Sequence, residues 1–150
     1  MSAATENVEH SRSTQRSGYR YFFYAKHHGG DVKAAMWLPS ISRDVEFSIF
    51  DQGDLHQIAD KRGWIYGVLL DDDGDLREIG RWDEQVAEFQ PGASIGEPWH
   101  GYPQWPVDAL GPANRRKQQC CPDRAIFDLM VTATMITKIQ RKRLLTGRNA

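Results

Sequence analysis

The stretch Trp64-Ile65-Tyr66-Gly67-Val68-Leu69-Leu70 is apolar on both faces of an extended chain. Strands that are covered on both faces read as continuous apolar runs, so residues 64–70 are predicted to form a central strand of a sheet. The run stops at Asp71-Asp72-Asp73-Gly74-Asp75, and Asp-Gly is typical of a hairpin turn. Residues 76–82 are then predicted to return as the antiparallel partner of that strand.

Segments on either side of this hairpin also have strand-like patterns. The aromatic run at 19–26 and the apolar run at 32–38 are predicted to pair across a turn at 27–31. Apolar and polar residues alternate over 45–49, which is the two-residue period of a half-buried strand. Residues 84–90 suit either a helix, by the spacing of their apolar side chains, or a short strand, by the glycine and proline that bound them.

A short helix is predicted before the central strand. Asp54 is a suitable N-cap for residues 55–62, whose apolar side chains share one face, and Gly63 would end the helix. Residues 91–122 follow the sheet and hold six of the seven prolines and four glycines of the chain. This composition predicts a long irregular segment that covers the sheet.

The end of the chain is predicted to be helical. Asp123 can cap a helix whose apolar stripe consists of Ile126, Phe127, Met130 and Val131. Thr137 and Gln140 match a capping box, so a second helix is expected over 138–146.

Together these patterns predict an α+β fold. It comprises an antiparallel sheet of about four to six strands, a short helix, the irregular cover at 91–122 and a C-terminal helical hairpin at 123–147. Residues 1–18 are polar and are predicted to be a disordered tail, and residues 19–150 are predicted to form a single domain.

Composition places the chain among ordinary globular proteins. It has 150 residues, of which 40% are hydrophobic and 11% aromatic, enough for a single core without disulfides. No apolar run reaches the length of about 20 residues that a membrane helix needs, and residues 1–18 lack a signal-peptide pattern. Cys120 and Cys121 are adjacent, and a bond between neighbours would be strained. Two free thiols suit a reducing compartment, so a cytoplasmic location is predicted.

Charge is distributed unevenly along the chain. Between Asp44 and Glu88 there are 13 acidic and 4 basic residues, whereas between Arg115 and Arg148 there are 9 basic and 2 acidic residues. Two opposite fields on one small protein can pair with each other or attract two different partners.

The segment Pro98-Trp99-His100-Gly101-Tyr102-Pro103-Gln104-Trp105-Pro106 is the strongest candidate for recognition. Its prolines stiffen the backbone, and its aromatic rings offer large contact areas at a low entropic cost. Packing as a plug that seals the core is the commoner fate of such rings and is the alternative role of this segment. We therefore predict a non-enzymatic protein-binding module, in which Trp99, His100, Tyr102 and Trp105 contact the partner while Asp71, Asp72, Asp73 and Asp75 supply an attractive field. Immunity and antitoxin proteins are small binding modules of this kind, and the comparison with them rests on analogy and not on any motif.

Nucleic-acid binding is the first alternative. Two helices in succession with a basic second helix resemble, in outline, a helix-turn-helix arrangement, although no third supporting helix is evident. Its phosphate contacts would come from Arg115, Arg116, Lys117, Lys138, Arg141, Lys142 and Arg143.

A metal-dependent enzyme is the second alternative. The acidic run at 71–75 fails the EF-hand pattern, because aligning Gly74 with the invariant glycine puts Leu69 and Gly80 at ligand positions. One of His27 and His28, with His100 and a cysteine of the pair 120–121, is a reasonable zinc-ligand set, but paired metal-ligand spacing is absent. The sequence has neither a nucleophile elbow nor a glycine-rich phosphate loop. No catalytic residue, metal or cofactor is therefore predicted.

Overall fold

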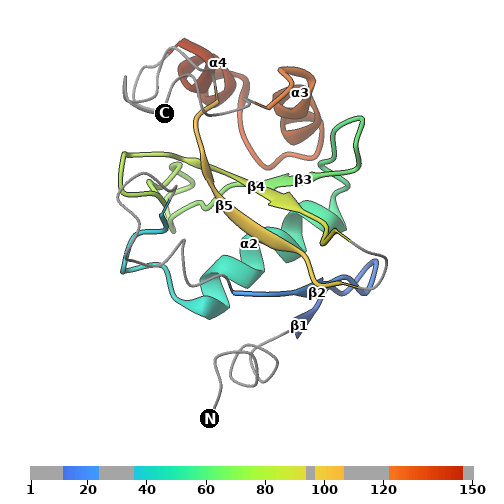
Figure 1. The fold of residues 1–150 in the computed structure, drawn as a ribbon. Coiled ribbons are helices and arrows are strands. Elements are labelled where there is room, and N and C mark those ends of the chain that lie inside the picture. Colours follow the sequence, from blue (N-terminus) through green and yellow to red (C-terminus); the bar gives the residue numbers. More distant parts are fainter. Residues whose placement is uncertain (1–11, 24–35, 94–96, 107–121, 147–150) are drawn as a thin grey trace.

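The computed structural model describes residues 12–23, 36–93, 97–106 and 122–146, and Figure 1 shows their arrangement. In chain order the elements are β1 (Arg12–Ser13), β2 (Arg20–Tyr21), α2 (Arg43–Leu55), β3 (Ile65–Gly67), β4 (Val86–Gln90), β5 (His100–Gln104), α3 (Ala125–Thr132) and α4 (Lys138–Thr146). The strands form two antiparallel sheets, β1-β2 and β3-β4-β5. The α+β class is confirmed, but the expected single sheet of about four to six strands is divided into sheets of two and three.

The first helix lies where a strand was predicted. Residues 45–49 belong to α2. Ser42 caps the start of this helix, where its hydroxyl accepts a hydrogen bond from the Val45 amide at 3.2 Å. The residues that α2 buries recur with helical spacing: Glu46, Ile49, Phe50, Asp51, Gly53 and Asp54. The strand predicted from the alternation over 45–49 is therefore wrong.

The predicted helix over 55–62 is also wrong, since α2 ends at Leu55 and the chain turns at Gln57, whose φ is 55°. Asp54 does not cap a helix. It is buried near the end of α2 and accepts hydrogen bonds from the amide and the hydroxyl of Ser17 at 3.0 and 2.6 Å. These bonds fix the turn between β1 and β2 against α2.

The sheet differs from the prediction in order and extent. Strand β3 lies at one end of its sheet, and β4 is the central strand. The turn at 71–75 is confirmed, but residues 76–82 make only isolated bridges, from Leu76 to Leu70 and from Gly80 to Trp37. Of the predicted hairpin 19–38, only β2 and a bridge from Trp37 to Gly80 are strand-like, and residues 24–35 lie outside the described residues.

The segment predicted to be irregular contains β5. Residues 100–104 pair along β4 from Gln90 to Val86, although Pro103 removes one backbone donor. The ambiguous segment 84–90 forms strand β4 over 86–90. Both C-terminal helices are present, and α4 has the predicted bounds. Its capping box is formed, because Thr137 Oγ1 accepts from the Gln140 amide at 3.0 Å while Gln140 Oε1 accepts from the Thr137 amide at 2.8 Å.

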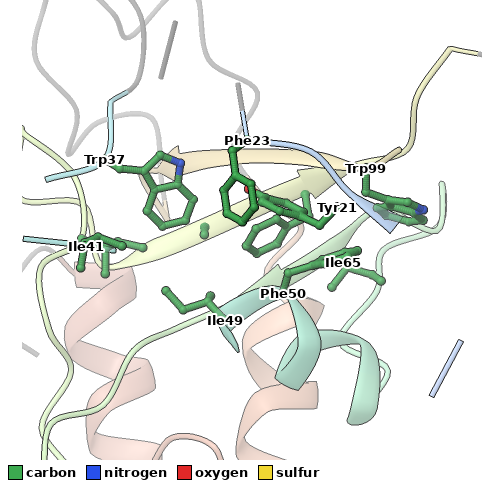
Figure 2. Close-up of a cluster of buried hydrophobic side chains, with 11 residues drawn as sticks. Tyr21, Phe23, Trp37, Ile41, Ile49, Phe50, Ile65 and Trp99 are labelled. Atoms are coloured by element: carbon green, nitrogen blue, oxygen red, sulfur yellow. The ribbon is translucent and has the colours of Figure 1, made fainter. Parts of the chain in front are cut away.

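The three-stranded sheet separates two apolar clusters. Helix α2 and strand β2 cover one face, where Tyr21, Trp37, Phe50 and Trp99 pack together (Figure 2). Phe89 of β4 belongs to the same cluster. Helices α3 and α4 lie on the opposite side in Figure 1, over Tyr66, Val68 and Val86. None of the helices in the described part of the chain combines the length and apolarity needed to cross a bilayer.

Glycine allows the close contact between α2 and β3. A Cβ atom at Gly53 would lie 2.7 Å from Ile65 Cγ2, and one at Gly67 would lie 2.6 Å from Ile49 Cγ2 and from the Ile49 carbonyl oxygen. Both distances are far below van der Waals contact. The two backbones therefore approach to a separation that only glycine permits.

Candidate recognition face

A polar row crosses the three-stranded sheet on the side of α3 and α4. Tyr66 on β3 lies opposite Glu88 on β4, which in turn lies opposite Tyr102 on β5. Opposed residues of neighbouring antiparallel strands project to the same face. The register of the strands therefore aligns one carboxylate between two phenols, although these residues are far apart in the sequence.

Glu88 is fully buried and accepts three hydrogen bonds. Its Oε2 accepts from the Tyr66 hydroxyl at 3.0 Å, and its Oε1 accepts from the Tyr102 hydroxyl at 2.5 Å and from Gln90 Nε2 at 3.0 Å. Gln90 Nε2 also lies 2.5 Å from the Tyr102 hydroxyl oxygen. A carboxylate in the interior is costly unless such donors surround it, so the cluster stabilises a negative charge inside the sheet face.

The row continues to a second carboxylate beyond β3. The Tyr66 hydroxyl lies 2.9 Å from Asp60 Oδ2, so its one proton is shared between Asp60 and Glu88. Burial alone would raise the pKa of Asp60, but hydrogen bonds from Arg62, Tyr66 and the Trp64 amide lower it below its usual value. Burial, and the charges of Glu88 and Asp60, raise the pKa of Tyr66 far above that of a free tyrosine. Tyr66 therefore stays protonated.

The row opens to solvent at β5. Tyr102 and Gln90 are half-buried, and so is His100, the cross-strand partner of Gln90. Because alternate residues of a strand share a face, His100 lies on the same side of β5 as Tyr102. We call His100, Tyr102, Glu88 and Gln90 the recognition face. It combines a buried negative charge with side chains that a partner can reach.

The aromatic segment predicted for recognition is divided between two sides. Trp99 is only 7% exposed, stacks on Tyr19 with a centroid separation of 4.6 Å, and belongs to the core cluster with Phe50. Figure 2 shows it at one end of this cluster. Trp105 is half-buried, and no described residue accepts a hydrogen bond from its indole nitrogen. The segment is therefore partly core and partly accessible.

The acidic turn, Asp71 to Asp75, is held by hydrogen bonds from its own amides to the Asp71 side chain. Asp71 Oδ1 accepts from the amides of Asp73 and Asp75 at 2.9 and 3.0 Å, and Gly74 takes a positive φ of 84°. Asp72, Asp73 and Asp75 are exposed. Gln140 of α4 donates to the Gly74 carbonyl oxygen at 2.8 Å, so the acidic turn lies beside the first turn of α4.

The basic residues proposed for nucleic-acid contact are only partly described. Lys138, Lys142 and Arg143 are exposed on α4, whereas Arg141 pairs with Asp128 of α3 at 2.7 Å. Arg115, Arg116 and Lys117 lie outside the described residues. Since α4 begins beside the acidic turn, the negative and positive regions adjoin within one molecule and partly offset each other's field.

Within the described residues, no group of three or more histidine, cysteine, aspartate or glutamate side chains has an arrangement that could hold a metal ion. Of the residues weighed for zinc, His27, His28, Cys120 and Cys121 lie outside the described part. His100 is paired across strands with Gln90 instead.

No family model matches the chain, and neither curated proteins nor solved structures show a significant similarity to it. Its function must therefore be argued from the geometry alone. The sequence pointed to His100 and Tyr102, but not to Glu88, Tyr66 or Gln90. The sequence holds one indication of this cluster. Glu88 lies within the apolar run Val86-Ala87-Glu88-Phe89, where a buried polar side chain needs a hydrogen-bond partner.

Proposed function

We propose that the chain is a small non-enzymatic protein-binding module that docks a partner through the recognition face, after attraction by the acidic turn. The observation that carries this proposal is the position of Glu88. Its charge is fully buried, yet it is joined directly to the half-exposed Tyr102 and Gln90. Phenol rings attract cations, and the Glu88 carboxylate that accepts from the Tyr102 hydroxyl adds negative charge at the end of that ring. A lysine or arginine side chain of the partner is the group that this arrangement suits.

The acidic turn supports the same partner chemistry. Its three exposed carboxylates add a negative field on the surface, and such fields steer oppositely charged proteins toward docking. His100 and Trp105 complete the accessible part of the aromatic segment and remain predicted contacts. The adjacent cysteines of the sequence support a cytoplasmic location for this interaction.

The test is affinity capture of the full chain, read by quantitative mass spectrometry. One variant carries His100→Ala, and another carries Asp72→Asn, Asp73→Asn and Asp75→Asn together. The matched control is Lys142→Ala, an exposed charge on α4. Removing three surface charges is expected to cost about 1–2 kcal/mol of binding, or roughly a tenfold loss of a specific partner.

We expect both variants to lose the same protein and the control to keep it. If all variants retain every captured protein, the recognition face has no binding role. Loss in the α4 control alone, together with recovery of DNA or RNA, would support the nucleic-acid alternative through Lys138, Lys142 and Arg143.

A further inference from the structure

A groove that shares no residue with the recognition face runs between α2 and the turn that joins α3 to α4. Its volume is about 350 Å³. Ile49, Val68 and Leu69 give it an apolar lining, and Ser48 and Gln52 of α2, with His56 directly after the helix, add a polar wall. The remaining lining residues are Leu70, Ala133, Thr134 and Met135. A concave apolar site with a few polar groups on one wall is the usual form of a binding pocket.

The rim of the groove exposes apolar side chains. Leu70 is 38% exposed, and Met135 is half-buried in the opposite wall. Apolar side chains gathered around a cavity are typical of interaction sites, and methionine adapts to apolar partners of varied shape.

One wall of the groove is the turn that ends α3. Thr134 has a φ of 59°, which is rare for a β-branched residue. The turn is fixed by hydrogen bonds from the Thr134 amide to the Val131 carbonyl at 3.0 Å and from the Met135 amide to the Met130 carbonyl at 2.9 Å. This pair of bonds is a Schellman motif, so the positive φ of Thr134 closes α3 and gives this wall of the groove a fixed shape.

Charge at one end of the groove indicates what binds there. Leu70, on the rim, is followed directly by the acidic turn, and the bond from Gln140 to Gly74 fixes this turn in place. An apolar group seated in the groove would therefore lie beside three exposed carboxylates. Charge complementarity favours an occupant that is cationic next to its apolar part.

We infer that the groove binds a short segment of a partner protein in which apolar side chains are flanked by lysine or arginine. This inference rests on the proposed protein-binding function and adds the site of apolar contact. The apolar side chains would contact Val68, Leu69 and Met135, and the basic flank would face Asp72, Asp73 and Asp75. The polar wall of α2 would offer hydrogen bonds to the backbone of the segment.

The experiment is selection of a displayed library of random peptides of about twelve residues against the full chain, followed by binding measurements on the enriched peptides. The groove variant is Leu70→Asp, and the matched control is Ile139→Asp, which changes an exposed apolar residue of α4. Circular dichroism and thermal unfolding confirm that each variant is folded.

We expect enriched peptides that pair apolar residues with lysine or arginine. Leu70→Asp should weaken their binding by tenfold or more (about 1.4 kcal/mol), while Ile139→Asp leaves it unchanged. Neutralising the three exposed aspartates should also weaken binding, and raised salt should do the same. This result would support the groove even if the recognition face proved inactive.

Several results would overturn the inference. They are failure to enrich any peptide, enrichment without basic residues, and equal loss in Leu70→Asp and Ile139→Asp. A concentration-dependent dimer that Leu70→Asp abolishes would assign the groove to a second copy of the chain. A small molecule that co-purifies in native mass spectrometry, and that Leu70→Asp releases, would assign it to that ligand instead.

Discussion

The replacement of Tyr66 by phenylalanine tests the buried carboxylate cluster most sharply. Tyr66→Phe keeps the volume of the ring but removes the hydroxyl, which within the described residues is the sole donor to Glu88 Oε2 and also contacts Asp60. A hydrogen bond to a charged group contributes about 1.5–3 kcal/mol, and an orphaned buried oxygen costs a similar amount. Because the one proton is shared between two carboxylates, we expect a loss of about 2 kcal/mol.

Tyr102→Phe is the matched comparison. Glu88 Oε1 keeps its bond from Gln90 when the Tyr102 hydroxyl is removed, and Tyr102 is half-exposed, so water can replace that hydroxyl. The expected loss is about 1 kcal/mol.

Urea unfolding curves of the three proteins give these free energies. In a chain of this length, about 2 kcal/mol corresponds to a fall in Tm of roughly 4–8 °C. A Tyr66→Phe protein as stable as the wild type, or less affected than Tyr102→Phe, would refute the assignment of Glu88 as a charge held by these donors.

Three further predictions concern Asp60, the buried tyrosines and Gly53. The folded-state pKa of Asp60 is lowered, so the free energy of unfolding should fall as pH decreases through and below about 4, and Asp60→Asn should flatten this dependence in acid urea titrations. The folded-state pKa values of Tyr21 and Tyr66 are raised, so both phenols should stay protonated above pH 10 while the protein is folded. The free energy of unfolding should therefore fall as pH rises above about 10. Ultraviolet difference titration should show fewer ionised tyrosines in the folded protein than in guanidinium chloride. Gly53→Ala should destabilise the fold by about 1–2 kcal/mol despite the better helix propensity of alanine, because its methyl group would overlap Ile65 and the Tyr66 carbonyl, whereas Gln52→Ala at an exposed position of the same helix should change little.

The elements that could be predicted from the sequence are those whose signals are local. The capping box of Thr137 and Gln140 defines the start of α4 within four residues of chain, and the apolar stripe of α3 is equally self-contained. The turn at 71–75 is likewise built from its own side chains.

Elements that depend on distant partners could not be predicted. Strand β5 contains Pro103, and its pairing with β4 comes from contacts that proline-rich composition does not indicate. In α2, alternation over 45–49 concealed a helix whose buried face is defined by packing against β3 and by contacts such as those from Ser17 to Asp54.

The same distinction applies to the candidate site. His100 and Tyr102 could be singled out from the sequence because aromatic and imidazole side chains are rarely gathered so closely in a short segment. Glu88 acquires meaning only through the strand register that places it between Tyr66 and Tyr102. The burial of Trp99 also depends on register, since it belongs to the face of the sheet that packs on α2.

Hydrogen–deuterium exchange of the chain, alone and with the protein that affinity capture identifies, tests the proposed docking surface most directly. We predict slower exchange on binding in residues 71–75 and 100–105, with little change in α4. Protection confined to 138–146, or unchanged exchange across both predicted segments, would contradict the proposed recognition face.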